Sequence, residues 1–107
     1  MISEQEVEKA VDYLRDTAEE AAKRKAERIY LEEFRKSLKA IIMKEFVDAT
    51  VSAQEREAYA DPRYIGHLET MRMAIQADEK IKFTRVAAEA KIEAWRSMNA
   101  NYRAMKI

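Results

Sequence analysis

The organisation of the chain is decided by TVSAQEREAYADP (residues 50–62), a short segment between two long helical patterns. Pro62 disfavours helix at Asp61 but suits the first turn of a new helix, which Asp61 can cap. Within the segment, Ser52-x-x-Glu55 has the form of a capping box and predicts a short helix over residues 53–60. The segment therefore predicts an elbow between two helices.

The patterns on either side of the elbow predict two long helices. Ser3-x-x-Glu6 is another capping box and opens a helix over residues 4–49, whereas Pro62 opens one over residues 62–105. At a rise of about 1.5 Å per residue, each helix would be about 65 to 70 Å long, which is far above the average for globular proteins. We therefore expect one all-α domain, residues 1–107, in which the two long helices flank the short one.

The apolar residues of both long helices indicate further packing partners. In the second helix a four-three seam, typical of a coiled coil, comprises Ala74, Ala77, Ile81, Thr84, Ala88, Lys91, Trp95, Met98, Tyr102 and Met105. In the first helix the apolar stripe covers roughly 160°, wider than the roughly 100° that one neighbouring helix needs. We therefore expect a homo-oligomer. Its interface is predicted to contain Phe34, Leu38, Ile42, Ile81, Ala88, Trp95 and Tyr102.

The net charge of zero is the sum of four alternating blocks. Residues 1–20 carry seven acidic and two basic side chains, residues 21–44 three and eight, residues 45–79 eight and three, and residues 80–107 two and seven. Blocks of opposite sign face each other if the long helices pair antiparallel. Each exposed pair contributes only about 0 to 1 kcal/mol, so the blocks select an orientation more than they stabilise it. We expect an antiparallel helical hairpin, or coiled coil, with a short helical elbow.

The composition excludes several kinds of active site. The chain contains no cysteine, one histidine and one glycine. Thiol catalysis, cysteine zinc sites, multi-histidine metal sites and glycine-rich phosphate loops are therefore excluded. Neighbouring carboxylates such as Glu19 and Glu20 point about 100° apart on a helix and do not form an acid–base pair. We expect a protein that is not an enzyme and has no catalytic residue, metal or cofactor.

The sequence carries no sign of membrane insertion or secretion. Its first residues, MISE, have neither a basic nor an apolar leader character, and no stretch approaches 18 uncharged apolar residues. We expect a cytoplasmic protein with no membrane partner.

Two groups of basic residues are candidate contacts to nucleic acid. Clustered cations release counterions from phosphates, and aromatic rings stack on unpaired bases. The candidates are Lys23, Arg24, Lys25, Arg28, Arg35, Lys36 and Lys39 in the first helix, and Arg96 and Arg103, beside Trp95, Asn99, Asn101 and Tyr102, in the second. Alternatively, these cations pair with the acidic blocks and the two aromatic residues belong to the core. An oligomer would repeat a modest patch and gain avidity.

His67 follows Gly66 in the first turns of the second predicted helix. Because histidine titrates near neutral pH, His67 is either a pH-responsive contact or an ordinary surface or interface residue. Glycine inside a helix costs about 1 kcal/mol relative to alanine, and a close approach of another backbone would offset that cost. Gly66 is therefore a candidate position for a close contact.

A family resemblance adds a functional expectation. Residues 71–80, MRMAIQADEK, lead into a long helix that carries Trp95-Arg96-Ser97. This arrangement of a Met-basic pair, an aliphatic residue and Ala-Asp before an amphipathic helix resembles the second half of phage recombination mediators of the UvsY type. The resemblance lies mainly in residues 71–105. It implies an oligomer that binds single-stranded DNA and helps a recombinase displace single-strand-binding protein.

Two other classes of function fit the same sequence. A small adaptor or inhibitor, of an anti-host or anti-defence type, would dock a partner on the apolar face around Phe34, Leu38 and Ile42. A structural coiled-coil component would bind only itself. Binding of single-stranded DNA that weakens with salt distinguishes the mediator from both.

Overall fold

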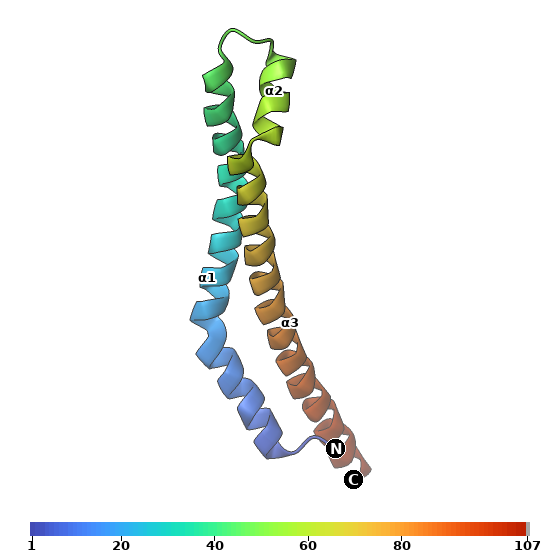
Figure 1. Cartoon of the computed structure of the whole chain (residues 1–107). Helices are drawn as coiled ribbons and strands as arrows, with labels where there is room; N and C mark the ends of the chain where they lie inside the picture. The colour runs from blue at the N-terminus through green and yellow to red at the C-terminus, as the bar shows by residue number, and fades with distance from the viewer. Residues whose placement is uncertain (107) are drawn as a thin grey trace. The chain divides into compact units, whose positions relative to one another are not determined.

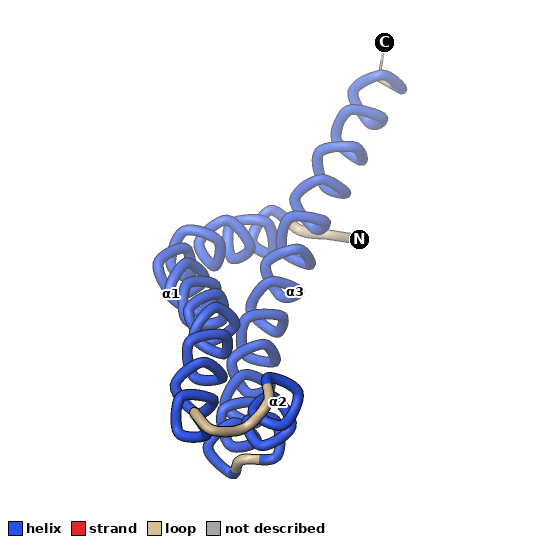
Figure 2. The backbone as a smooth tube through the Cα atoms, turned by 90° about the horizontal axis from the view of Figure 1, so that it is seen from above, coloured by secondary structure: helices blue, strands red, loops and turns tan. Residues whose placement is uncertain are grey.

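The computed structural model describes residues 1–106, and helix is the regular secondary structure found over that range (Figures 1 and 2). The elements are α1 (Glu4–Met43), a short 3-10 helix (Lys44–Phe46), α2 (Val51–Ala60) and α3 (Pro62–Met105). The prediction of an all-α protein with a long helix on either side of a short one is confirmed.

The chain forms two compact units. Unit 1 combines residues 1–22 with the chain from Glu79 onward, and unit 2 comprises residues 23–78. Unit 1 therefore contains the start of α1 and most of α3. Unit 2 contains the rest of α1, all of α2 and the start of α3.

Two of the predicted helix caps are present. The hydroxyl Oγ of Ser3 accepts a hydrogen bond from the backbone N–H of Glu6 at 3.2 Å, at the start of α1. At the start of α3, Asp61 is extended, with φ −69° and ψ 133°, and its Oδ1 accepts from the N–H of Arg63 at 2.8 Å. These bonds satisfy backbone donors that have no partner within the helix, so the chain begins each long helix where the sequence predicts.

The structure differs from the prediction at the end of the first long helix and at the start of the short helix. The first long helix was expected to reach residue 49, but α1 ends at Met43 and the 3-10 helix follows. The side-chain amide of Gln54 donates to the carbonyls of Phe46 at 2.9 Å and Ala49 at 3.1 Å, so a side chain from α2 holds the segment that joins the 3-10 helix to α2. The start of α2 is capped by Thr50, whose Oγ1 accepts from the N–H of Ala53 at 3.2 Å. Ser52 is therefore inside the helix and is not its cap.

The core of unit 2 explains why α2 folds back beside the end of α1 (Figure 1). Ile42 and Ala58 are completely buried, and Tyr64 is nearly so. The small Ala58 side chain lets α2 approach closely, and the rings of Tyr59 and Tyr64 meet edge to face with centroids 5.3 Å apart. Burial of an isoleucine side chain contributes about 1.5 to 3 kcal/mol, so this cluster stabilises the elbow.

Contacts between α1 and α3 extend along each unit. In unit 2, Nε2 of His67 lies 2.7 Å from the carbonyl oxygen of Leu31, and Leu31 and Met71 are buried. In unit 1, Nη1 of Arg85 donates to Thr17 Oγ1 and to the carbonyl oxygen of Leu14, both at 2.7 Å. In each unit a stretch of α1 therefore lies beside a stretch of α3.

None of the helices within residues 1–106 combines the length and the apolar character needed to cross a membrane.

Candidate interaction surfaces

The aromatic and basic residues near the end of α3 form a pocket of about 310 Å³ in unit 1. It is lined by Glu4, Trp95, Arg96, Asn99, Tyr102 and Arg103, and we call it the aromatic–basic pocket. Five of these six residues lie on α3 at helical spacing. The sequence therefore predicted their proximity correctly, whereas Glu4 comes from the start of α1.

The charges of the aromatic–basic pocket are partly balanced. Nη1 of Arg96 lies 3.3 Å from a carboxylate oxygen of Glu93, and Nε of Arg103 donates to the carbonyl of Asn99 at 3.4 Å. Tyr102 is 57% exposed, and Nζ of Lys106 lies 4.6 Å from the centroid of its ring. An exposed ring beside guanidinium groups can stack on a nucleic-acid base while the cations contact phosphate.

Three of the predicted DNA-binding residues of α1 are engaged within the chain. Lys36 pairs with Glu33 at 3.2 Å. Nζ of Lys39 donates to the hydroxyl of Tyr59 at 2.8 Å, a bond that raises the pKa of Lys39. Nε of Arg28 lies 2.6 Å from a carboxylate oxygen of Asp78, and Arg28 is half-buried. Arg28 and Lys39 therefore connect parts of unit 2 to one another.

The other candidate bases of α1 present their side chains to solvent. Lys23, Arg24, Lys25 and Arg35 are all exposed. Lys23 and Arg24 also interact with other residues of the chain. The exposed basic tract of unit 2 therefore centres on residues 23–25.

The residues predicted to form the oligomer interface lie in several different environments. Ile42 is completely buried because α2 and Tyr64 cover it, which leaves no surface on it for a second chain. Leu38 is half-buried against the same cluster, and the half-buried ring of Phe34 lies 5.6 Å from that of His67. In unit 1, Ile81 and Ala88 are half-buried, and Trp95 and Tyr102 line the aromatic–basic pocket.

Other large apolar side chains of these helices are exposed. They include Ile29, Tyr30, Ile41, Ile65, Leu68 and Met73 in unit 2, and Val11, Phe83 and Val86 in unit 1. Most of these residues belong to no surface that the sequence predicts. The sequence does indicate some of them, because pairs such as Ile65 and Leu68, or Phe83 and Val86, lie three residues apart and so share one face of a helix.

His67 is part of the contact between α1 and α3. Because a carbonyl oxygen only accepts, His67 donates from Nε2 to Leu31. Gly66 does not mark a close contact, since a Cβ atom at Gly66 would have no heavy atom within 4 Å outside its own helical surroundings. Gly66 lies on the exposed side of α3, so no neighbouring backbone approaches it.

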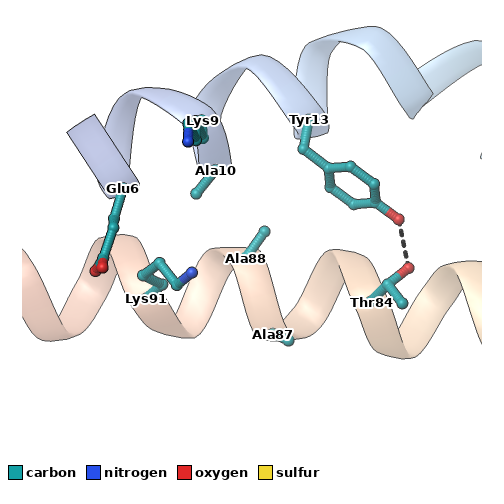
Figure 3. A pocket seen from close by; sticks show the side chains of 8 residues that line it. All are labelled: Glu6, Lys9, Ala10, Tyr13, Thr84, Ala87, Ala88 and Lys91. Carbon is teal, nitrogen blue, oxygen red and sulfur yellow. Dashed lines mark hydrogen bonds between the residues drawn. The ribbon is translucent and has the colours of Figure 1, made fainter. Parts of the chain in front are cut away.

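A second pocket lies in unit 1 between the start of α1 and α3, with a volume of about 390 Å³ (Figure 3). Its lining residues are Glu6, Lys9, Ala10, Tyr13, Thr84, Ala87, Ala88 and Lys91, and we call it the alanine groove. At one end, the hydroxyl of Tyr13 lies 2.5 Å from Thr84 Oγ1. Sequence reasoning missed the groove because its width depends on the distance between two helices.

Within residues 1–106, no three or more acidic or histidine side chains are grouped so that they could hold a metal ion. No protein-family model matches the chain, and no match was found among curated proteins or solved structures.

Proposed function

We propose that the protein is a non-enzymatic, self-associating helical hairpin that binds single-stranded DNA. The observation that carries the proposal is the aromatic–basic pocket, where Trp95 and Tyr102 lie beside Arg96 and Arg103. Aromatic rings and cations on one surface are the combination that holds single strands without reading their sequence. Self-association would repeat the pocket and strengthen a modest site through avidity.

The contacts of unit 2 support the antiparallel arrangement in this proposal. Arg28 of α1 pairs with Asp78 of α3, whereas Leu31, further along α1, pairs with His67, which comes earlier in α3. A residue later in α1 therefore pairs with a residue earlier in α3, which is the pattern of antiparallel helices. The alternating charge blocks favour the same orientation.

The resemblance to UvsY-type mediators extends the proposal to a biological role. In that role the assembled protein acts in the cytoplasm, binds single-stranded DNA and helps a recombinase replace single-strand-binding protein. A strand-exchange reaction on DNA covered by single-strand-binding protein tests this role. The proposal requires that the protein shortens the lag of the reaction.

Fluorescence anisotropy with a labelled oligothymidine tests the pocket itself. Tyr102→Ala and Arg103→Ala change exposed side chains, so both variants should remain helical. We expect Tyr102→Ala to weaken binding about tenfold, because stacking on one base contributes about 1 to 3 kcal/mol. We expect Arg103→Ala to weaken binding as well, because it removes a cation that contacts phosphate. Tyr30→Ala and Arg72→Ala are matched controls, since they remove an exposed ring and an exposed guanidinium of unit 2. Equal losses in the pocket variants and the controls would argue against the pocket.

The basic tract of α1 is tested separately. Replacement of Lys23, Arg24 and Lys25 together by alanine should weaken binding of single-stranded DNA without lowering the helix content measured by circular dichroism. An unchanged affinity in this variant would remove residues 23–25 from the proposed interface.

A second candidate function is that of a protein-binding adaptor or inhibitor. It is favoured by the exposed apolar side chains Ile65, Leu68 and Met73 near the start of α3. The pairing of Lys36 and Lys39 with acidic residues of the chain also favours it, because these cations are then less available to phosphate. An adaptor, like a purely structural coiled coil, would bind no single-stranded DNA even at low salt.

A further inference from the structure

Glu4 is the acidic residue among those that line the aromatic–basic pocket. It lies in the first turn of α1, whereas the other five lining residues belong to α3. A carboxylate beside Arg96 and Arg103 repels phosphate, so Glu4 works against the phosphate contacts that we propose for the two arginines. The place of Glu4 in the pocket therefore fits a contact to another part of the nucleotide.

The carboxylate of Glu4 is available to a ligand. Over residues 1–106 it takes part in no hydrogen bond or ion pair, although two guanidinium groups line the same pocket. Those groups have other partners in the chain: Arg96 lies 3.3 Å from a carboxylate oxygen of Glu93, and Arg103 donates to the carbonyl of Asn99 at 3.4 Å. Glu4 is also exposed, so a base in the pocket can reach its oxygens.

The chemistry of a carboxylate distinguishes the four bases. An ionised carboxylate only accepts hydrogen bonds, and the bases of a single strand expose their Watson–Crick edges. Guanine presents two adjacent donors on that edge, N1–H and the 2-amino group, which match the two carboxylate oxygens. Adenine and cytosine each present one amino group beside an acceptor, and thymine presents one N–H between two carbonyls. Because bidentate hydrogen bonds to a charged group are the strong ones, guanine fits Glu4 best.

Stacking and hydrogen bonding can act on the same base in this pocket. Stacking on Trp95 or Tyr102 uses the face of a base and leaves its edge for polar groups. The pocket volume of about 310 Å³ is far above the roughly 30 Å³ share of one water molecule, so a base has room beside the rings. The aromatic rings accept any base, and Glu4 is the lining residue that favours one of them.

We propose that Glu4 accepts hydrogen bonds from the Watson–Crick edge of a guanine stacked in the aromatic–basic pocket, so that the chain prefers single strands that contain guanine. This inference rests on the proposed function and names the base that its site selects. The rings and arginines supply binding to any single strand, including oligothymidine, and Glu4 adds the preference.

Three oligonucleotides of equal length test the preference by fluorescence anisotropy. The first is an oligothymidine, and in the other two every third thymidine is replaced by deoxyguanosine or by deoxyinosine. Inosine keeps N1–H but lacks the 2-amino group, so it offers Glu4 one donor in place of two. We expect the guanine strand to bind at least about fivefold more tightly than oligothymidine, the low end for one bidentate contact to a base. The inosine strand should lose most of this gain.

Glu4→Gln tests whether Glu4 is the residue that selects guanine. The variant replaces one of the two acceptor oxygens by a donor, so the preference for guanine over thymine should fall to about twofold or less. Its affinity for oligothymidine should stay the same or rise, because a negative charge near phosphate is removed. Glu8→Gln is the matched control: it makes the same charge change at an exposed residue of unit 1 that does not line the pocket, and should keep the preference. Circular dichroism checks that both variants keep their helix content.

The outcomes separate this inference from the proposal on which it rests. If the wild-type chain binds none of the three strands, both are overturned. Binding that is equal for thymine and guanine, or equal for guanine and inosine, overturns the inference alone. If Glu4→Gln changes the affinity for all three strands by the same factor, Glu4 acts only through its charge and the inference is again overturned.

Discussion

Nε of Arg28 in α1 lies 2.6 Å from Oδ2 of Asp78 in α3, and Asp78 is only 6% exposed. The contact is an ion pair without a well-aligned hydrogen bond from Nε. Arg28 also lies 3.4 Å from a carboxylate oxygen of Glu32. Because an unpaired carboxylate is costly to bury, this contact disfavours any shift of α3 along α1 within unit 2.

The ion pair predicts an asymmetry between single and double variants. Arg28→Ala leaves Asp78 buried without its partner and should lower the free energy of unfolding by about 3 kcal/mol. Replacing both residues by apolar ones, Arg28→Met with Asp78→Leu, should recover most of that loss, because no buried charge is left unpaired. Urea denaturation monitored by circular dichroism measures both. Equal destabilisation in the single and double variants would count against this role of the pair.

The core of unit 2 predicts different effects at two adjacent isoleucines. Ile42 is completely buried and Ile41 is half exposed. Ile42→Ala should therefore cost about 3 kcal/mol of unfolding free energy through lost burial and a cavity. Ile41→Ala should cost less than about 1 kcal/mol, since its side chain is largely in solvent. Similar losses at the two positions would mean that α2 does not cover Ile42 in solution.

The elbow predicts which of two hydroxyl residues caps α2. Thr50→Ala removes the acceptor for the N–H of Ala53 and should lower the free energy of unfolding by about 1 kcal/mol. Ser52→Ala is the matched control, because Ser52 lies inside the helix and is exposed. Thermal or urea unfolding of the two variants measures how much stability each one loses. A larger loss for Ser52→Ala would favour the capping box read from the sequence.

Asp61 predicts a loss of stability in acid. Hydrogen bonds from the Arg63 side chain and backbone N–H lower the pKa of Asp61 below its ordinary 3.8. The unfolded chain therefore binds a proton before the folded chain does, so this carboxylate stabilises the fold above about pH 4 and the effect fades at lower pH. Asp61→Asn keeps a capping side chain but cannot titrate. The difference in melting temperature between wild type and this variant should shrink as the pH falls from about 5 to about 2. A difference that does not change with pH would contradict the prediction.

Structural features that depend on one stretch of the chain could be predicted from the sequence. The caps at Ser3 and Asp61, and the clustering of Trp95, Arg96, Asn99, Tyr102 and Arg103, depend on backbone spacing alone. The sequence did not predict that α1 ends at Met43, because the contacts that hold the segment after it come from another helix: Gln54 of α2 donates to the carbonyls of Phe46 and Ala49.

Contacts between distant residues were not predictable in the same way. The ion pair of Arg28 with Asp78 joins residues fifty positions apart, and no spacing rule selects that carboxylate from the others. Ile42 was assigned to an oligomer interface because the apolar stripe of α1 is wide. In the structure α2 and Tyr64 cover that part of the stripe, so the chain itself supplies a second neighbour.

A salt titration measures directly whether the assembled chain binds single-stranded DNA through its cations. The affinity of the full chain for a labelled oligothymidine is measured between about 50 and 200 mM NaCl. We expect a micromolar or tighter dissociation constant at the lowest salt, which rises at least about tenfold across the range as counterions compete for phosphate. No binding at about 50 mM, or an affinity that does not change with salt, would contradict it.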